Sequence, residues 1–153
     1  MAKNFSSTIS NIKIRILVVD DEPDILLGLS ALLERRGNYV KTFDNPAEAL
    51  EHIGSGDVYY DLVITDYRMP GGLSGLDLAK QVKEHKRRKG GRGRRKTKVF
   101  LMTAFDIMSL PKLNEPELNE AAKSEIVDEI IQKPIRNDKL IAIIESSFLY
   151  NNH

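Results

Sequence analysis

Four short strand-like runs, each stopping abruptly at a polar or charged residue, constrain the fold of this 153-residue chain more than any other feature. A continuous apolar run bounded by turn residues is typical of a buried strand. We expect these strands at residues 14–19, in the stretch 61–70 that contains Asp66, at 98–102 and at 128–132, and a further strand at 39–43, where the residues alternate. The run from Leu62 to Ile64 ends in Thr65 and Asp66 and is soon broken by Pro70.

Between these runs, apolar residues recur at helical spacing. Helices are expected at 24–36, from Pro46 to near Gly54, after the Gly-rich turn that ends at Gly75, and at about 117–126. A last helix begins at a cap formed by Asn137 or Asp138. Strand and helix thus alternate five times, which predicts an α/β fold: a parallel sheet with helices on both faces and right-handed crossovers.

The length and composition fit one globular domain, with 41% hydrophobic and 29% charged residues. The chain has no cysteine, which excludes disulfides, thiolate zinc sites and a cysteine nucleophile. Its apolar runs are too short for a membrane span, so no membrane partner is expected. Residues 1–12 are predicted to be a flexible polar leader, and a cytoplasmic location follows by default.

The net charge of +1 conceals one strongly basic segment. Residues 83–98 contain ten Lys or Arg and one Glu, so the remainder of the chain is acidic. Glycines within the segment favour a flexible basic loop inserted at about 86–97. Such a loop is usually a solvated segment; the alternative is contact with nucleic acid or an acidic partner, which the lack of interleaved aromatics weakens.

In a parallel sheet, the carboxyl ends of all strands lie along one edge, where ligands bind. The predicted strands deliver Asp20 and Asp21, Asp66, Thr103 and Lys133 to that edge. Three clustered carboxylates repel one another, and a hard cation such as Mg²⁺ resolves the conflict. An ammonium and a hydroxyl beside them suit the oxygens of a phosphoryl group attached at Asp66.

The ordered motifs VVDDE (18–22), ITDYRMP (64–70), LMTA (101–104) and QKP (132–134) resemble the receiver domain of two-component response regulators. The resemblance covers residues 13–150 and implies a flavodoxin-like, doubly wound sheet with strand order 2-1-3-4-5. It also implies a signalling switch or phosphorelay intermediate, not a metabolic enzyme. Its partners would be a sensor histidine kinase or a histidine phosphotransfer protein, and a downstream protein target.

The resemblance further implies a role for each matching residue. Asp66 would accept the phosphoryl group from a phosphohistidine. Mg²⁺ would be held by Asp66, by Asp21 directly, by Asp20 largely through water, and by the backbone carbonyl of Arg68. Around the phosphoryl group, Thr103 would donate a hydrogen bond, Lys133 would pair with it, and the small side chain of Ala104 would keep the approach open.

The chain departs from the family pattern at Ile130, where receivers usually have a Tyr or Phe that turns inward on phosphorylation. We therefore expect a muted or rerouted conformational response, with Tyr67 or Phe105 as substitutes. The gap between Thr103 and Lys133 is also longer than usual, which alters the region that often contacts partners. A second hypothesis is an adaptor that uses the receiver fold as a scaffold and residues 83–98 for contact. A third hypothesis is a phosphatase or phosphotransferase with an aspartyl nucleophile. Enzymes of the haloacid-dehalogenase type have a second acid two residues after the nucleophile, and Arg68 stands at that position here, which disfavours this hypothesis.

Overall fold

The structure is a computed structural model that describes residues 13–55, 58–89, 96–112 and 114–149. The predicted leader at 1–12 and the centre of the predicted basic loop, 90–95, lie outside the described residues. Within the described ranges, no helix combines the length and the apolar character needed to cross a lipid bilayer.

Five parallel strands form a single sheet, and its order, β2-β1-β3-β4-β5, confirms the predicted topology. The strands are β1 (Arg15–Val19), β2 (Tyr39–Phe43), β3 (Leu62–Asp66), β4 (Lys98–Thr103) and β5 (Glu129–Gln132). From β1 the chain first runs outward to β2 and then returns to place β3 on the other side of β1. The carboxyl ends of β1 and β3 therefore flank the point where the order reverses, and crevices for ligands form at such points.

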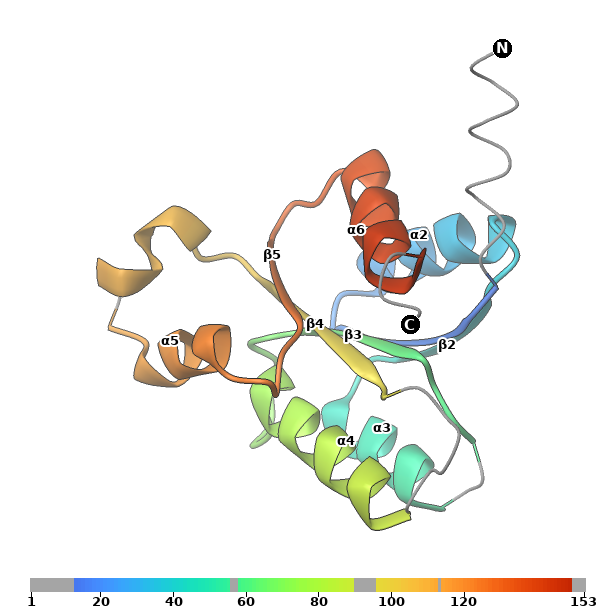
Figure 1. Cartoon of the computed structure of the whole chain (residues 1–153), viewed down its shortest axis with the longest axis horizontal. Coiled ribbons are helices and arrows are strands. Elements are labelled where there is room, and N and C mark those ends of the chain that lie inside the picture. The colour runs from blue at the N-terminus through green and yellow to red at the C-terminus, as the bar shows by residue number, and fades with distance from the viewer. Residues whose placement is uncertain (1–12, 56–57, 90–95, 113, 150–153) are drawn as a thin grey trace.

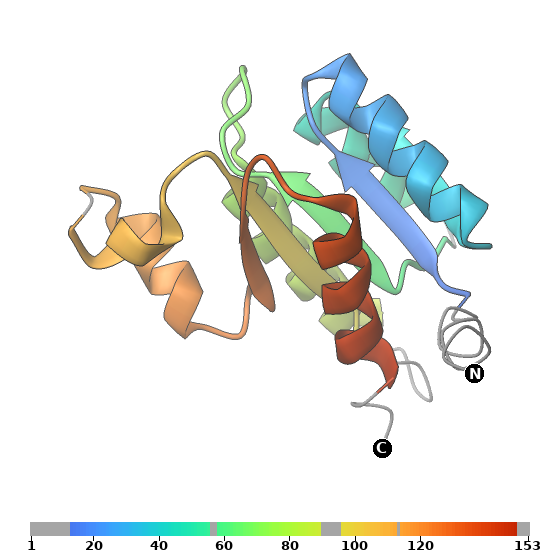
Figure 2. The same ribbon diagram turned by 90° about the horizontal axis from the view of Figure 1, so that it is seen from above.

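Helices cover both faces of the sheet, as Figure 1 shows. The helices α2 (Pro23–Arg35) and α6 (Asn137–Leu149) lie on one face, and α3 (Pro46–Ser55) and α4 (Gly75–Lys89) lie on the other. The connection between β4 and β5 holds the 3-10 helix η1 (Ile107–Lys112) and the short helix α5 (Pro116–Lys123). Figures 1 and 2 both place η1 and α5 beyond the β5 side of the sheet.

Alternate residues along each central strand enter two separate apolar cores, because successive side chains of a strand point to opposite faces. In β1, Leu17 and Val19 join the core under α3, α4 and α5, whereas Ile16 and Val18 join the core under α2 and α6. All four are fully buried. Burial on both faces explains the continuous apolar runs of the sequence and holds the strand ends in fixed positions.

The basic segment begins as a helix and not as a loop. Helix α4 continues through Lys89, so the predicted loop boundary near residue 86 is wrong by one helical turn. Lysine and arginine are good helix formers, which allows the helix to continue through Lys86, Arg87, Arg88 and Lys89.

The connection between β4 and β5 also differs from expectation. Pro111 lies within η1, an element that the sequence did not indicate, and Pro116 begins α5 at a position that favours proline. Helix α5 ends at Lys123, three residues before the predicted end. Helix α6 starts at Asn137 itself, so this residue lies in the first turn.

Candidate functional site

Asp66 is the last residue of β3 and sits at the carboxyl edge of the sheet. All five residues of β3 are buried, which fixes the backbone that presents the carboxylate. The backbone N–H of Tyr67 donates to Asp66 Oδ1 at 3.1 Å. Asp66 itself is 7% exposed, so its carboxylate can be reached from solvent although it is largely removed from water.

Asp20 and Asp21 follow directly after β1, the strand next to β3. Asp20 is fully buried, and its Oδ1 accepts a hydrogen bond of 2.9 Å from the backbone N–H of Glu22. Its other oxygen, Oδ2, is buried too and lies 3.0 Å from Lys133 Nζ. One oxygen of Asp20 thus fixes the start of α2, and the second faces the ammonium of Lys133.

The structure brings all three predicted acids together: Asp20, Asp21 and Asp66 each offer a carboxylate oxygen within 4.8 Å of the others. Burial is the main cause that raises the pKa of Asp66 above its usual value, and the negative charge of Asp20 adds to it. The Lys133 ammonium works in the opposite direction without cancelling these effects. A cluster of this kind favours any ligand that brings positive charge.

Lys133 provides part of that charge from the end of β5. Its Nζ lies 3.0 Å from Asp20 Oδ2, 3.2 Å from Asp66 Oδ1 and 3.4 Å from Glu22 Oε1. Burial by itself lowers the pKa of Lys133, but its hydrogen bond to Asp20 and the charges of Asp20 and Asp66 raise it overall. The ammonium therefore stays protonated at neutral pH and binds both neighbouring acids.

The donor set fits Mg²⁺. Hard cations of this size bind carboxylate oxygens and keep several waters. Three carboxylates lie within reach of one another, and their negative charge exceeds what the single Lys133 ammonium can balance. Arg68 stands two residues after Asp66, and its carbonyl stays a predicted ligand.

Thr103 and Ala104 complete the predicted set at the end of β4. Thr103 is 2% exposed, and its Oγ1 accepts a hydrogen bond of 3.1 Å from the Phe105 N–H. Thr103, exposed Ala104, Asp66 and Lys133 line one cleft of about 630 Å³. The predicted residues at the ends of β3, β4 and β5 therefore converge on one space large enough for a phosphoryl group.

Three further residues shape this site. Glu22 contacts Lys133, and its place in the VVDDE motif is a local signal for that contact. Gly75 packs so closely that a Cβ atom there would lie 1.9 Å from the carbonyl oxygen of Asp66. Glu115 binds the side chains of Tyr67 and Arg68, which follow Asp66. No local pattern in the sequence indicates that contact, because Glu115 is distant along the chain.

The first lysine of the basic segment, Lys83, is placed away from this site. It donates to the carbonyl of Thr97 at 2.9 Å and pairs with Asp128 at 3.0 Å. Thr97 and Lys98 stand at the start of β4, which is the opposite edge of the sheet from Asp66. Lys83 therefore serves the fold by fixing α4 to β4, although it belongs to the segment that the adaptor hypothesis uses for contact.

Comparison with known proteins was made on sequence and on structure. Residues 16–145 match the profile of the family described as the response regulator receiver domain. The transcriptional regulatory protein DltR of Streptococcus agalactiae is 32% identical over 130 residues, which cover 85% of this chain and 50% of that protein. The putative two-component response regulator ARR21 of Arabidopsis thaliana is 38% identical over 81 residues, covering 53% of this chain and 13% of that protein.

Among solved structures, the response regulator protein TrrA of Thermotoga maritima, crystallised in complex with Mg²⁺-BeF, is similar with a TM-score of 0.63. The two chains are 34% identical, and the match covers 86% of this chain and 96% of that one. The chain spans no more than about half the length of the first curated relatives it matches.

Proposed function

Because the chain belongs to the response regulator receiver domain family, we propose that Asp66 accepts a phosphoryl group from the phosphohistidine of a partner protein. Phosphorylation on an aspartate is the general function of this family. The observation that supports Asp66 as the acceptor is its position: it lines the cleft at a strand end, beside two further acids and an ammonium.

In the proposed reaction, an oxygen of the Asp66 carboxylate attacks phosphorus. The new P–O bond forms as the P–N bond to the donor imidazole breaks, and the electron pair of that bond returns to the imidazole nitrogen, which takes up a proton. The carboxylate is already an anion, so the step requires no separate base on this chain.

Receiver domains bind Mg²⁺ in an acidic pocket, and we assign that ion here to Asp20, Asp21, Asp66 and the carbonyl of Arg68. When bound, Mg²⁺ would neutralise negative charge on the carboxylates and on the incoming phosphoryl oxygens.

Lys133 and Thr103 would hold the phosphoryl oxygens. Lys133 Nζ is 3.2 Å from Asp66 Oδ1. After phosphorylation it could therefore pair with a phosphoryl oxygen on Asp66 without a large movement. The hydroxyl of Thr103 accepts from Phe105 N–H, and its own proton is thus free to be donated. Ala104 adds only a methyl group to the cleft and leaves room for the donor histidine.

The partners that this chemistry requires are a sensor histidine kinase or a histidine phosphotransfer protein as donor, and a downstream protein that distinguishes the two states. Nucleic-acid contact through residues 83–98 remains the alternative prediction.

The test is to incubate the protein with Mg²⁺ and either acetyl phosphate or phosphoramidate, and then to measure its intact mass. We expect the unmodified sequence to gain one phosphoryl mass and Asp66→Asn to gain none. Asp44→Asn is the matched control, since Asp44 is an exposed acid that follows β2 at the same edge of the sheet. Equal labelling of Asp66→Asn, or no labelling of the unmodified sequence with either donor, would refute the assignment.

A further inference from the structure

Both residues that follow Asp66 bind the same distant carboxylate. Tyr67 Oη donates to Glu115 Oε2 at 3.2 Å, and Arg68 Nη2 pairs with Glu115 Oε1. Each oxygen of Glu115 is therefore engaged by the turn that begins at Asp66. The Arg68 side chain is 66% exposed, and an exposed ion pair contributes little by itself. Tyr67 is 5% exposed and the Glu115 side chain 18% exposed, so the hydrogen bond between these two is the part of the contact that is shielded from water.

Glu115 stands immediately before α5, at the position that would cap the helix. Its side chain makes no capping hydrogen bond to the helix, because its oxygens bind Tyr67 and Arg68 instead. Any change in the turn after Asp66 thus reaches the first residue of α5 through two side-chain contacts.

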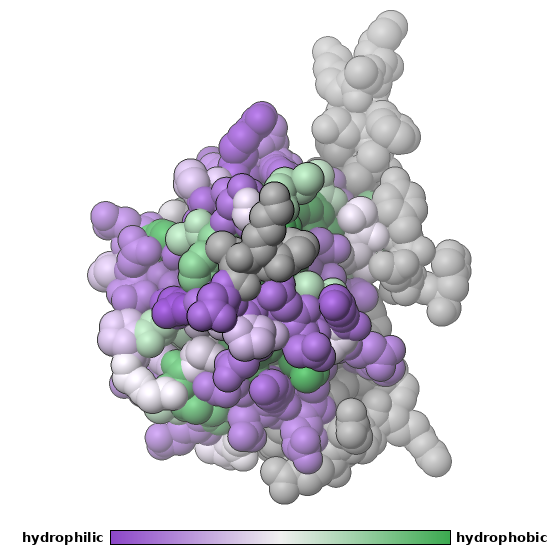
Figure 3. All heavy atoms as spheres, turned by 90° about the vertical axis from the view of Figure 1, so that its left-hand side faces the viewer, coloured by the Kyte–Doolittle hydropathy of each residue, from purple (hydrophilic) through white to green (hydrophobic). Residues whose placement is uncertain are grey.

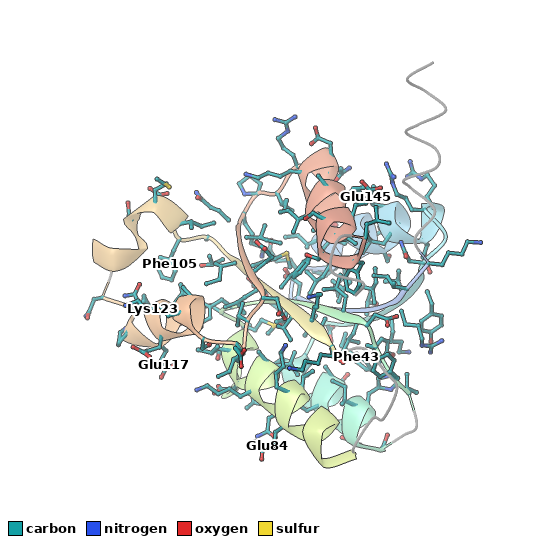
Figure 4. All side chains as sticks on the ribbon, viewed as in Figure 1. Phe43, Glu84, Phe105, Glu117, Lys123 and Glu145 are labelled. Carbon is teal, nitrogen blue, oxygen red and sulfur yellow. The ribbon has the colours of Figure 1, made fainter. Side chains whose placement is uncertain are left out.

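Phe105 adds a connection from β4 to the same contact. Its ring centroid lies 6.4 Å from that of Tyr67, and the Arg68 guanidinium lies 5.3 Å from the Phe105 ring centroid. Figure 4 shows Phe105 on the side of the molecule that carries η1 and α5. Because the Phe105 N–H donates to Thr103 Oγ1, a shift of the Thr103 hydroxyl toward Asp66 would displace the Phe105 backbone and its ring.

Ile130 occupies the position of the aromatic that receivers commonly use to register phosphorylation. It is half-buried and packs against the core that also contains Tyr67 and Leu118. Isoleucine offers neither a ring nor a hydroxyl that could exchange partners. The cluster of Tyr67, Arg68 and Glu115 has both, together with a charge that responds to new negative charge at Asp66.

We propose that Glu115 is a positioning residue that couples Asp66 to α5: it holds Tyr67 and Arg68 before phosphorylation and releases Arg68 to the phosphoryl oxygens afterwards. Arg68 lines the same cleft as Asp66, Thr103 and Lys133, so its guanidinium is within the space where the new charge appears. A phosphoryl group carries more negative charge than one carboxylate and binds guanidinium through several oxygens. Loss of Arg68 from Glu115 would loosen the start of α5. This inference rests on the proposed function of Asp66.

The test is amide hydrogen exchange of Pro116–Lys123 in the full chain, with and without beryllofluoride and Mg²⁺. In the unmodified sequence, we expect beryllofluoride to speed α5 exchange about tenfold, as loss of a charged hydrogen bond would. In Glu115→Gln, α5 should already exchange at that faster rate without beryllofluoride and should respond little to it. Glu120→Gln, an equal charge change at an exposed position of α5, should behave as the unmodified sequence.

Arg68→Gln is the second variant, because it removes the ion pair and keeps the Tyr67–Glu115 hydrogen bond. It should blunt the beryllofluoride response of α5. If the unmodified sequence gains phosphoryl mass but α5 exchange does not change, or if Glu115→Gln behaves as Glu120→Gln, the coupling is refuted and the proposed function stands. If no phosphoryl mass is gained, the proposed function falls and the coupling falls with it.

Discussion

The two halves of the carboxyl edge of this sheet are built differently. At β1 and β3, the functional residues Asp20, Asp21 and Asp66 follow or end their strands directly, and each is fixed by a strand buried on both faces. At β4 and β5, the chain inserts residues 104–128, with η1 and α5, between Thr103 and Lys133. The first half is determined by local sequence, whereas the second is tied to it by the long-range contact of Glu115 with Tyr67 and Arg68.

The surface of the connection that holds η1 and α5 is mostly hydrophilic. Figure 3 faces the η1 and α5 side and shows hydrophilic residues over most of it, with small separate hydrophobic areas. Met108 on η1 is 88% exposed, whereas Leu118 and Ala121 on α5 are buried in the core under α4. Helix α5 is thus held by a few apolar side chains and by Glu115, which suits an element that changes state.

The largest expected effect tests whether α5 belongs to the core. Leu118 is fully buried, so Leu118→Ala should lower the free energy of unfolding by about 2–5 kcal/mol. Met108→Ala, on the exposed part of the same connection, should change it by less than about 0.5 kcal/mol. Urea denaturation measures both. A loss below about 1 kcal/mol for Leu118→Ala would mean that α5 unfolds independently of the sheet.

The next largest effect on the free energy of unfolding is expected from Gly75→Ala, which adds a Cβ atom in the segment after β3. In Gly75→Ala the new Cβ would meet the backbone carbonyl of Asp66, and backbone cannot move aside as a flexible side chain does. We expect a loss of about 1–3 kcal/mol in the free energy of unfolding and slower phosphoryl incorporation at Asp66. Gly72→Ala is the control, since no atom lies within 4 Å of a Cβ there. Equal behaviour of the two variants in urea denaturation and mass analysis would contradict the assigned role of Gly75.

A smaller effect is expected in the pH dependence of stability, and it arises from Asp66 in the cluster with Asp20 and Asp21. Since the pKa of Asp66 is raised above 3.8, the native state binds more protons than the unfolded state between 3.8 and the raised value. The metal-free protein should therefore lose stability as pH rises through that window. Asp66→Asn should remove this loss and raise the thermal midpoint of the metal-free protein at neutral pH.

Mg²⁺ provides the control for that prediction. It should stabilise the unmodified sequence more than Asp66→Asn in thermal unfolding, because the ion would relieve the repulsion that the substitution already removes. Equal stabilisation of both proteins by Mg²⁺ would mean that Asp66 does not take part in the metal site.

The apolar runs predicted the strands, and the residues that end them predicted the convergence of Asp66, Asp20, Asp21 and Lys133. The strand order was implied by the resemblance to receiver domains and not by the runs themselves. It predicted α5 only in part and did not indicate η1, since prolines at 111 and 116 favour a break and do not show how the chain continues. The contact of Glu115 with Tyr67 and Arg68 could not be predicted, because long-range pairing depends on the path of the intervening chain.

The smallest expected effect lies on α3, away from the acids. His52 Nε2 lies 2.7 Å from Tyr60 Oη, and the His52 and Phe43 ring centroids are 5.1 Å apart. Burial, and then the charge of Lys41, lower the pKa of His52 below 6.5. The native state therefore binds fewer protons than the unfolded state between the lowered value and 6.5, and stability should fall as pH drops through that window.

His52→Gln should make the stability less sensitive to pH between about pH 7.5 and about pH 5, as measured by urea denaturation at both values. His85, His153 and Asp66 are present in both proteins, so their contributions cancel in the comparison. An identical pH dependence in the two proteins would show that His52 titrates alike in the folded and unfolded states. The effect should be unchanged in a Glu115→Gln background, because distant sites without shared partners contribute independently. Additivity of these two substitutions would show that the contacts of His52 contribute to stability independently of the Glu115 contact with Tyr67 and Arg68.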